Sequence, residues 1–593
     1  MFEQENPFFS RRLFIFTLFQ GALVSSLIAR LYYLQIYKES FYKILSDKNY
    51  LQYKLTEPSR GIIVDRNNKV LASHKTNYKV FYDPSITKDK DVVQKINVLL
   101  KISPEKKTDI RSKRQNILIK DYLSWEELSI LELNSHKLQG MVIEKGESRL
   151  YHFPLLTSHI IGYTSSISKE QKKEDEKNDL LWTLPGFKIG KTGLEKVYND
   201  FLQGEAGYKK VAVDAYGKIA HSIAEEKPKK GKTLHLSIDL NVQNAVTEVL
   251  KEFRSASVTV LNIHNGEILS MVSQPQFDAT IFDSKISSQQ WKKIQNDSDN
   301  PLINKNIAGL YAPGSIFKLV VAYAALHENL IDENTRFSCS GYHDLGGHRF
   351  HCWKWKYGGH GSLDVMQAIA QSCDVYFYHL GLKLGQKKIA EYAKVFGYGE
   401  LTGIDIPGER KGFVPDREWK KEKLKTEWFK GDTLNMSIGQ GYLLATPLQN
   451  AHAVSILVNK QRKNIPHFNT KLCEKFIPVH LNKHCLDIVQ EGMRCAVQEP
   501  LGTAHHYSSE DIPLAGKTAS TQVSRISMKD RESGNVNGKG YFLQEHAMFV
   551  GYAPIDDPQY SISVLVEHGG GGGRVAAPVA KKVVQILQKY NYV

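Results

Sequence analysis

Cysteine is scarce in this chain, which has six cysteines among 593 residues. So few, at uneven positions, exclude a domain built on a disulfide framework. An internal repeat of roughly 20–50 residues is not visible either, which excludes a repeat array. A chain of this length is too long for one compact core, so we expect two or more domains.

Acidic residues are the minority charge. Lys and Arg number 78 against 63 Asp and Glu, which gives a net charge of +15 and an isoelectric point near 9.1. A basic chain can bind nucleic acid, an anionic membrane surface or an anionic polymer. The charge is scattered over short clusters, and no zinc-finger or RNA-binding signature accompanies them. We therefore expect solvated surface and no nucleic-acid partner.

Long hydrophobic runs are missing except at the N-terminus. Residues 13–29 form a stretch of 17 residues without a charge, near the short end for a membrane-spanning helix. Two arginines precede the run and two tyrosines follow it. A cleaved signal peptide is the main rival, but no convincing A-x-A site follows; a buried helix is the other alternative. We predict an uncleaved anchor at 13–33, a cytoplasmic tail at 1–12, and the rest of the chain outside the cytoplasm.

The chain after the anchor divides at a charged linker. Residues 34–235 are mixed and charged, with strand-like pieces around a predicted turn at DRNN, 65–68, and they end near EKPKKGK at 226–232. Beyond the linker, two β-rich runs flank Asn265-Gly266, a strong hairpin signal. Two strands, a helical insert, three strands and a closing helix predict an α+β domain at 236–593, with helices packed on an antiparallel sheet.

The pattern S-x-x-K occurs five times and fits chemistry best in YAPGSIFK, residues 311–318. A Pro-Gly pair ends the preceding segment and an apolar, helical run follows, so Ser315 and Lys318 share one helix face. Free N–H groups at a helix start can hold an oxyanion. A lysine among apolar residues should be partly desolvated, which favours the neutral amine that can act as a base. The alternative is an ordinary helix start with a solvated lysine.

Two later motifs follow in the order found in active-serine penicillin-recognising enzymes. SCD at 372–374 begins a second apolar segment, and KTA at 517–519 lies on a strand-like run. KTG at 191–193 fits the literal third motif better, but it precedes Ser315 and opens a helix-like segment. The chemistry needs a strand edge beside the acyl group, so we choose Lys517.

With these motifs the chain resembles the class B penicillin-binding proteins, and most closely their penicillin-binding protein 2 group, the elongation-specific peptidoglycan transpeptidases. The likeness runs nearly end to end and includes RGIIVDRN at 60–67, GKTGLEKVYND at 190–200 and LNMSIGQGYLLATPLQ at 434–449. Aspartate at 374 is what the elongation enzymes show, and it argues against the division-specific paralogue. Two departures are Ala519, where glycine is usual, and RLYH at 149–152, where relatives usually carry a tyrosine-proline pair. Glycine leaves room for substrate beside the strand, so the added methyl is expected to narrow the groove.

The resemblance implies an N-terminal transmembrane helix, an elongated mixed α/β pedestal (the dimerisation domain) at 34–235, and a transpeptidase domain. The latter is expected to have a central antiparallel five-stranded sheet flanked by helices. A single pass through the bacterial inner membrane, with the catalytic domain in the periplasm, is also implied. The expected partner is a membrane glycosyltransferase of the shape, elongation, division and sporulation family.

The implied activity is serine-type transpeptidation of D-Ala-D-Ala stem peptides, with D,D-carboxypeptidase as a side activity and covalent binding of β-lactams. Ser315, deprotonated by Lys318, attacks the penultimate D-Ala carbonyl, and an amine of a second stem peptide then takes the acyl group. The residues that the resemblance assigns are Ser315, Lys318, Ser372, Asp374 and Lys517 for catalysis, and Thr518 and Ser520 for substrate binding.

Two other functions stay open. A serine β-lactamase or β-lactam sensor uses the same acylation chemistry, but no base for rapid deacylation can be pointed to. A non-catalytic scaffold that binds a glycosyltransferase would keep the fold, and the intact set of motif residues speaks against it.

A cysteine- and histidine-rich stretch, residues 339–361, suggests a metal site. Cys339, Cys352, His360 and Cys373 would supply three thiolates and one imidazole, a set suited to tetrahedral Zn²⁺. Their spacing matches no ordinary finger; the resemblance adds that relatives can carry a metal here, often with aspartates at the first two positions. Competing ligands are His343, His348 and His351. The alternatives are a disulfide between Cys339 and Cys352, favoured by an oxidising compartment, or plain buried thiols. The sequence leaves open whether the remaining cysteines are free or bridged, namely Cys473, Cys485 and Cys495.

Overall fold

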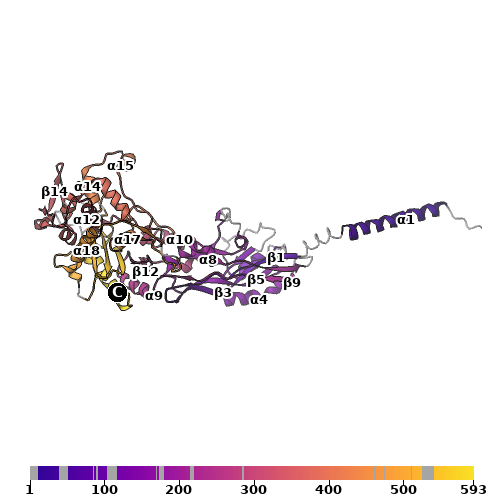
Figure 1. The fold of residues 1–593 in the computed structure, drawn as a ribbon. Helices are drawn as coiled ribbons and strands as arrows, with labels where there is room; N and C mark the ends of the chain where they lie inside the picture. Colours follow the sequence, from indigo (N-terminus) through magenta and orange to yellow (C-terminus); the bar gives the residue numbers. More distant parts are fainter. Residues whose placement is uncertain are drawn as a thin grey trace, which may run out of the picture.

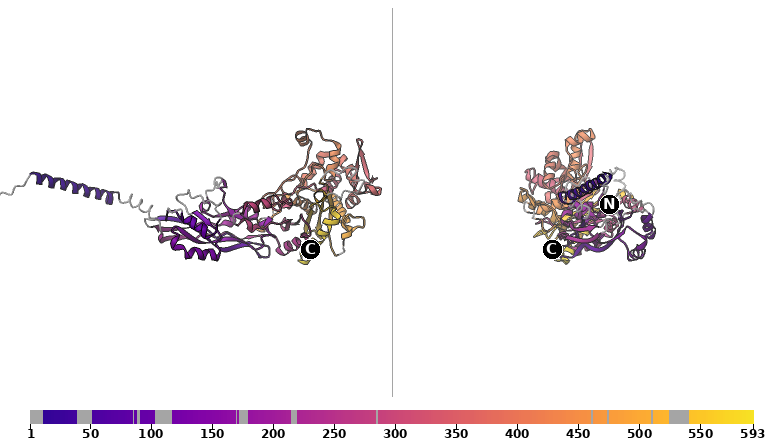
Figure 2. Two further views of the ribbon diagram at one scale, coloured as in Figure 1. Left: turned by 180° about the vertical axis from the view of Figure 1, so that it is seen from behind. Right: turned by 90° about the vertical axis from the view of Figure 1, so that its right-hand side faces the viewer.

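The computed structural model of this chain shows an elongated molecule (Figure 1). Helix α1 (Arg11–Tyr32) projects at one end, a pedestal of strands follows, and the C-terminal domain lies at the other end, as the view from behind also shows (Figure 2). The structure describes residues 11–38, 51–84, 86–87, 91–102, 117–168, 170–171, 179–213, 219–283, 286–459, 462–472, 475–508, 511–523 and 540–593.

The N-terminal helix has the properties of a membrane anchor. Residues Phe14–Ile36, which include the π-helical turn η1 (Tyr33–Tyr37), are long and apolar enough to cross a membrane, with a mean hydropathy of 1.6. This span is not buried by the rest of the protein. An apolar helix without protein cover fits a lipid environment. Residues 1–10 of the expected cytoplasmic tail lie outside the described residues.

Two sheets build the pedestal. The first has the antiparallel order β1-β8-β9 and the second has the order β10-β2-β3-β4, with β5 paired along the other side of β3. Their strands are β1 (Leu51–Thr56), β2 (Ile63–Val64), β3 (Val70–Tyr82), β4 (Ile117–Lys120), β5 (Met141–Tyr151), β8 (Gly207–Val213), β9 (Ile219–Glu226) and β10 (Leu234–His235). The turn expected at 65–68 joins β2 to β3, where Asp65 accepts the N–H groups of Asn67 and Lys69.

Smaller elements complete the pedestal. They are α3 (Asp91–Leu99), α4 (Trp125–Leu133), α5 (Ser158–Ile161), β6 (Thr164–Ser166), β7 (Lys188–Gly190), α7 (Gly193–Val197) and α8 (Asn199–Gln203), with the 3-10 turns η2 (Ser135–Lys137) and η3 (Leu180–Thr183). Helices α3 and α4 bury apolar residues such as Ile96 and Leu131 against Val80 and Tyr82 of β3. This gives the pedestal a core of its own.

The C-terminal domain is built on the expected five-stranded antiparallel sheet, with the order β12-β11-β21-β20-β19. Its strands are β11 (Ala256–Asn262), β12 (Ile268–Gln274), β19 (Ala515–Thr521), β20 (His546–Ala553) and β21 (Tyr560–Val566). The hairpin predicted at Asn265-Gly266 joins β11 to β12, and Gly266 has the positive φ (+83°) that such a turn favours. The sheet is buried on both faces, so helices must cover it on both sides.

Helices form a layer on each face of this sheet. On one face α9 (Leu240–Leu250) and α20 (Gly572–Lys589) share a core with Val258, Ile562 and Val564. The other face is covered by the helical insert between β12 and β19. Its helices are α10 (Ser288–Gln295), α11 (Lys305–Ala308), α12 (Lys318–His327), α13 (Val365–Ala370), α14 (Asp374–Val395), α15 (Arg417–Leu424), α16 (Lys430–Ser437), α17 (Pro447–Val458) and α18 (Lys483–Gln498).

Short strands and 3-10 turns connect these helices. They are β13 (Phe337–Cys339), β14 (Tyr342–Leu345), β15 (His348–His351), β16 (Gly361–Leu363), β17 (Arg462–Asn464), β18 (Phe476–Pro478), η4 (Ala279–Phe282), η5 (Gly314–Ile316), η6 (Trp355–Tyr357), η7 (His505–Tyr507) and η9 (Tyr541–Leu543). Residues 318–326 of α12 are all buried, as expected for a helix that is apolar on every side. The turn before α12 contacts β19, the edge strand of the sheet, and this contact places the candidate site.

Candidate active site

Residues 311–316, here named the nucleophile turn, lead into α12 and carry Ser315. Gly314 has a φ of +56°, and a Cβ on it would come 2.5 Å from Cγ2 of Thr521 on β19. Only glycine therefore fits here without moving the strand. The Gly314 N–H donates to the carbonyl of Gly439 at 2.8 Å, so the SIGQG segment holds the turn from its other side. Ser315 stays partly exposed.

Lys318, the first residue of α12, has no exposed surface. Its amine lies 2.7 Å from Oδ1 of Asp374 and donates to the carbonyl of Ser372 at 2.9 Å and to the Ser372 hydroxyl at 3.3 Å. A buried ammonium without such acceptors would be strongly unfavourable. The structure thus joins the first and second predicted motifs at one amine.

The second motif lies in the turn between α13 and α14. Ser372 has a φ of +55°, a left-handed conformation that is uncommon for a residue with a side chain and that clusters at functional sites. Asp374 begins α14. Burial raises the pKa of the Asp374 carboxyl above its ordinary value, although the Lys318 amine acts in the opposite direction. The Lys318 amine holds this carboxyl at Oδ1.

The third motif lies on β19, close to the other two. Lys517 is completely buried, and its amine donates to the carbonyl of Thr518 at 3.1 Å. Burial lowers the pKa of Lys517 well below its ordinary value; the charge of Lys318 lowers it further, and Asp374 raises it. These effects favour a neutral Lys517 amine beside the Lys318–Asp374 pair.

Successive side chains of β19 point to opposite faces of the sheet. Ser520 is exposed, and its hydroxyl accepts the N–H of Gly572 at 3.0 Å, while the hydroxyl of Thr518 donates to that of Thr503 at 2.7 Å. Ala519 is only 3% exposed and packs toward Gly314. The methyl group that departs from the usual motif therefore faces the nucleophile turn and the core, and not the side of the strand on which Ser520 is exposed.

The competing KTG sequence lies in the pedestal, between β7 and α7. Gly193 has a φ of +58°, and a Cβ on it would come within 2.6 Å of backbone atoms at the end of α5. This motif is a strand-to-helix connection in another part of the chain. Of the two candidates, Lys517 is the one that the fold brings to Lys318.

The four predicted metal ligands come together beside the second motif. One ligand atom from each of Cys339, Cys352, His360 and Cys373 lies within 4.8 Å of all the others. Nδ1 of His360 is 3.4 Å from the sulfur of Cys352 and 3.6 Å from that of Cys339. Hydrogen bonds from the other two thiols lower the pKa of Cys339, which favours a thiolate. Three sulfurs and one imidazole nitrogen at this spacing fit a tetrahedral ion such as Zn²⁺.

Of the two alternatives for this cluster, the structure contradicts the disulfide and leaves buried thiols open. Cys339, Cys352 and Cys373 are free thiols, so the disulfide is absent. The competing histidines lie on the β14–β15 hairpin, where the His343 ring contacts His379 and the His351 ring contacts Trp355. Of the remaining cysteines, Cys485 and Cys495 are free as well, and Cys473 lies outside the described residues.

Trp353 links the cysteine cluster to the catalytic motifs, and the sequence analysis missed it. Its backbone N–H donates to Oδ2 of Asp374 at 3.0 Å, and its indole N–H donates to the carbonyl of Gln371 at 3.1 Å. Because Trp353 directly follows Cys352, the cluster orients the carboxylate that holds Lys318. The only signal in the sequence was this adjacency.

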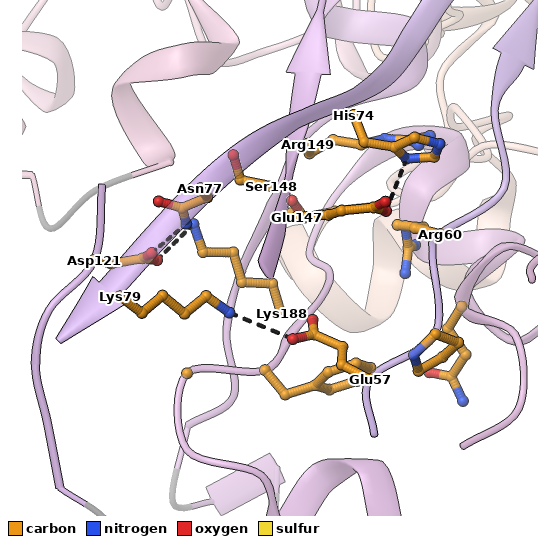
Figure 3. Close-up of a pocket in the computed structure, with 15 residues that line it drawn as sticks. Glu57, Arg60, His74, Asn77, Lys79, Asp121, Glu147, Ser148, Arg149 and Lys188 are labelled. Atoms are coloured by element: carbon orange, nitrogen blue, oxygen red, sulfur yellow. Dashed lines mark hydrogen bonds and ion pairs between the residues drawn. The ribbon is translucent and has the colours of Figure 1, made fainter. Parts of the chain in front are cut away.

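A polar pocket in the pedestal is a separate feature (Figure 3). Lys79 lies 3.4 Å from Glu57 there, and in the same region the buried Glu195 accepts from Arg60 at 2.7 Å and from Arg149 at 2.6 Å. These charges are paired with one another within the pedestal, which indicates a structural ion-pair network. Arg149 is the first residue of RLYH, where relatives usually carry a tyrosine-proline pair, so this sequence has a structural role.

Comparisons with known proteins agree with this geometry. Residues 256–585 match the model of the penicillin-binding protein transpeptidase domain, and residues 55–236 match that of the penicillin-binding protein dimerisation domain. The peptidoglycan D,D-transpeptidases MrdA of Haemophilus influenzae and Escherichia coli are each 32% identical to the chain; the alignments cover 99% and 96% of it and 94% and 93% of the relatives. The structure of a complex between PBP2 and MreC from Helicobacter pylori matches with a TM-score of 0.81 at 31% identity, covering 92% of this chain and all of that one.

Fold and motifs together define a penicillin-binding protein whose transpeptidase domain stands on a pedestal. The chain belongs to the class B penicillin-binding proteins and, within them, to the PBP2 group.

Proposed function

We propose that this protein is a peptidoglycan D,D-transpeptidase of cell elongation, with Ser315 as its nucleophile. The observation that carries the proposal is the buried Lys318 amine at the start of α12, three residues after Ser315, which contacts Ser372 and Asp374. The shared identity with the MrdA transpeptidases over nearly the whole chain supports it. Neither a β-lactamase nor a non-catalytic scaffold is favoured by these relatives.

In the proposed acylation step, the Ser315 hydroxyl attacks the carbonyl of the penultimate D-Ala and transfers its proton to a neutral Lys318 amine. A new ester forms, the peptide bond to the terminal D-Ala breaks, and Ser372 relays the proton to the departing amine. Backbone N–H groups of Ser315 and Ser520 hold the oxyanion. Lys517 and Thr518 bind the terminal carboxylate, which accepts hydrogen bonds from the amine and the hydroxyl.

An amine of a second stem peptide then attacks the ester, which forms the cross-link and frees Ser315. Attack by water instead gives D,D-carboxypeptidase activity, which belongs to the same proposal as a side reaction. Penicillin acylates Ser315 by the same attack, which breaks the C–N bond of its β-lactam ring, and slow hydrolysis of the resulting ester distinguishes a transpeptidase from a β-lactamase.

The test is cross-link formation on a membrane-bound glycan substrate with a labelled stem peptide. Wild-type protein should form cross-linked dimers, and Ser315→Ala should form none while keeping its melting temperature. Rapid turnover of penicillin without any cross-link would contradict the proposal and favour a β-lactamase.

The cysteine cluster is proposed to hold one structural Zn²⁺ through Cys339, Cys352, His360 and Cys373. Bound there, the ion would lock the insert to the turn of the second motif. Metal analysis should find about one zinc per chain, as in closed four-ligand sites. Cys352→Ser should lose the metal and melt at a lower temperature, whereas Cys495→Ser, outside the cluster, should keep both. A wild-type protein that binds no zinc would reject this site and leave the transpeptidase proposal standing.

The setting is proposed to be the bacterial inner membrane, with residues 1–12 in the cytoplasm, the anchor at 13–33, the pedestal at 34–235 and the transpeptidase domain, 236–593, in the periplasm. A similar structure, 27% identical with a TM-score of 0.69, is of a peptidoglycan synthase complex that coordinates polymerization and crosslinking. We propose a membrane glycosyltransferase of the shape, elongation, division and sporulation family as the partner of this chain too.

A further inference from the structure

Glu567 lies where three parts of the transpeptidase domain meet, and the mechanism above gives it no role. It directly follows β21. The hydroxyl of Tyr311 donates to its Oε1 at 2.7 Å, and the hydroxyl of Ser255, just before β11, donates to its Oε2. The backbone of Glu567 is fixed as well: its N–H donates to the carbonyl of Ser255 at 3.0 Å, and its carbonyl accepts the hydroxyl of Tyr541 at 3.3 Å.

Tyr311 links Glu567 to the turn that contains Ser315. It is the first residue of the nucleophile turn, four positions before Ser315, and is only 8% exposed. Its backbone pairs in both directions with Ala445, at 3.0 and 2.8 Å, and its ring meets that of His546 edge to face at 5.2 Å. Burial and the neighbouring charge of Glu567 raise the pKa of Tyr311, so its hydroxyl stays protonated and donates. Glu567 therefore fixes the side chain at which the turn begins.

The chain segment that follows Glu567 leads to β19. Residues 568–571 connect Glu567 to α20, whose first two residues are glycines. The N–H of Gly572 donates to the hydroxyl of Ser520 at 3.0 Å, and a Cβ on Gly572 would come 2.1 Å from the carbonyl oxygen of Ala519. This segment therefore packs directly on the backbone of the strand that carries the third motif. Glu567 is thus linked to the turn of Ser315 through its carboxylate and to the strand of Ser520 through the chain segment that follows it.

We propose that Glu567 is a positioning residue for acylation, which acts through Tyr311 to set the spacing between Ser315 and β19. The inference rests on the proposed function, in which N–H groups of both elements hold one oxyanion. Such a site tolerates little displacement, because a shift of about 1 Å can slow a reaction about 100-fold. A carboxylate that accepts two hydroxyl hydrogen bonds makes a stiff connection, since charge-assisted hydrogen bonds are shorter and stronger than neutral ones.

The test measures acylation of the full-length protein by a fluorescent penicillin, with the non-covalent binding constant separated from the acylation rate constant. Glu567→Ala should lower the rate constant by about 10- to 100-fold, as a small misplacement predicts, and should change the binding constant by less than about threefold. Glu567→Gln keeps the shape and one acceptor, so it should recover part of the loss. Glu409→Gln is the matched control: Glu409 also accepts a hydroxyl, that of Thr402 at 2.6 Å, and its variant should react like wild type.

Tyr311→Phe removes the same hydrogen bond from its other side. If Glu567 acts through Tyr311, the double variant should react no more slowly than the slower single variant, because the two losses are one interaction. Fully additive losses, or a Glu567→Ala protein that reacts at the wild-type rate, would overturn the inference and leave the proposed function intact. If Glu567→Ala does not fold, Glu567→Gln and Tyr311→Phe decide by the same criterion. A wild-type protein that forms no acyl-enzyme would overturn both.

Discussion

Two lysines without exposed surface, Lys318 and Lys517, lie near the Asp374 carboxylate in the centre of the site. The Lys318 amine donates to Asp374 at 2.7 Å, and burial lowers the pKa of Lys517 well below its ordinary value. A buried cluster is tolerable only when its charges balance. The two lysines thus differ in a way that their types alone do not reveal: Asp374 holds the Lys318 amine, whereas burial disfavours the charged form of Lys517.

Replacing Lys517 should stabilise the protein while disabling it. Burial lowers the pKa of this amine below its ordinary 10.5, so the unfolded chain binds a proton there that the folded protein does not. This difference costs stability below pH 10.5, and the cost shrinks as the pH rises toward that value. Lys517→Met should therefore melt at a higher temperature than wild type at pH 7, with a smaller gain at pH 9.5, and should acylate slowly. Thermal unfolding at both pH values checks this; a lower melting temperature at pH 7 would contradict it.

Spacing and motif order were enough to predict Ser315, Lys318, Ser372 and Lys517, because each lies in a short pattern. Tyr311 and Glu567 could not be predicted as partners, because they are 256 positions apart in the sequence and no local pattern indicates their contact. The four proposed zinc ligands are an intermediate case. Their types suggested a cluster, and the fold was needed to bring Cys373 to the other three.

At the scale of elements, the site is a junction between a helix start and a sheet edge. The apolar runs predicted five strands, and the Asn265-Gly266 turn predicted one pairing. The sequence could not give the full strand order, because β11 pairs with β21 across the whole helical insert. This closure brings the nucleophile turn against β19, where the glycine at 314 permits the close approach.

Gly314→Ala tests this junction. An alanine at this position would have to adopt a positive φ. Its methyl group would also lie 2.5 Å from Cγ2 of Thr521, so the turn or β19 must move. We expect acylation to slow by about 10-fold or more, since small displacements at a reacting centre are costly. Gly346→Ala is the matched control, with a similar φ of +59° but open space around it. It should cost about 1–2 kcal/mol of stability for the left-handed conformation alone and should acylate normally. Equal acylation by both variants would contradict the tight junction.

At the scale of the whole molecule, the pedestal separates the anchor from the catalytic domain (Figures 1 and 2). The pedestal has its own core and the paired network of Arg60, Arg149 and Glu195, so it can serve as a rigid spacer. A rigid spacer holds the active site at a fixed height above the membrane, where a polymer is cross-linked. The elongated shape therefore suits an enzyme that acts on a substrate at a distance from its anchor.

The anchor should hold the protein in the membrane whatever the salt concentration. Burial of an apolar helix does not depend on ionic screening, whereas attachment through the basic surface would. High-salt washing should leave the full-length protein in the membrane fraction. Deleting residues 1–33 should give a soluble protein that acylates at the wild-type rate, because the site lies in another domain. Release of the full-length protein by salt would contradict the anchor.

The identity of the acylated residue tests the central claim most directly. Purified protein is treated with penicillin and digested, and the adduct is located by peptide mass spectrometry. The site described here predicts one adduct per chain, on Ser315, and none in Ser315→Ala, whereas Ser166→Ala, which alters an S-x-x-K serine in the pedestal, should label fully. An adduct on any other serine, or labelling that persists in Ser315→Ala, would contradict the assignment.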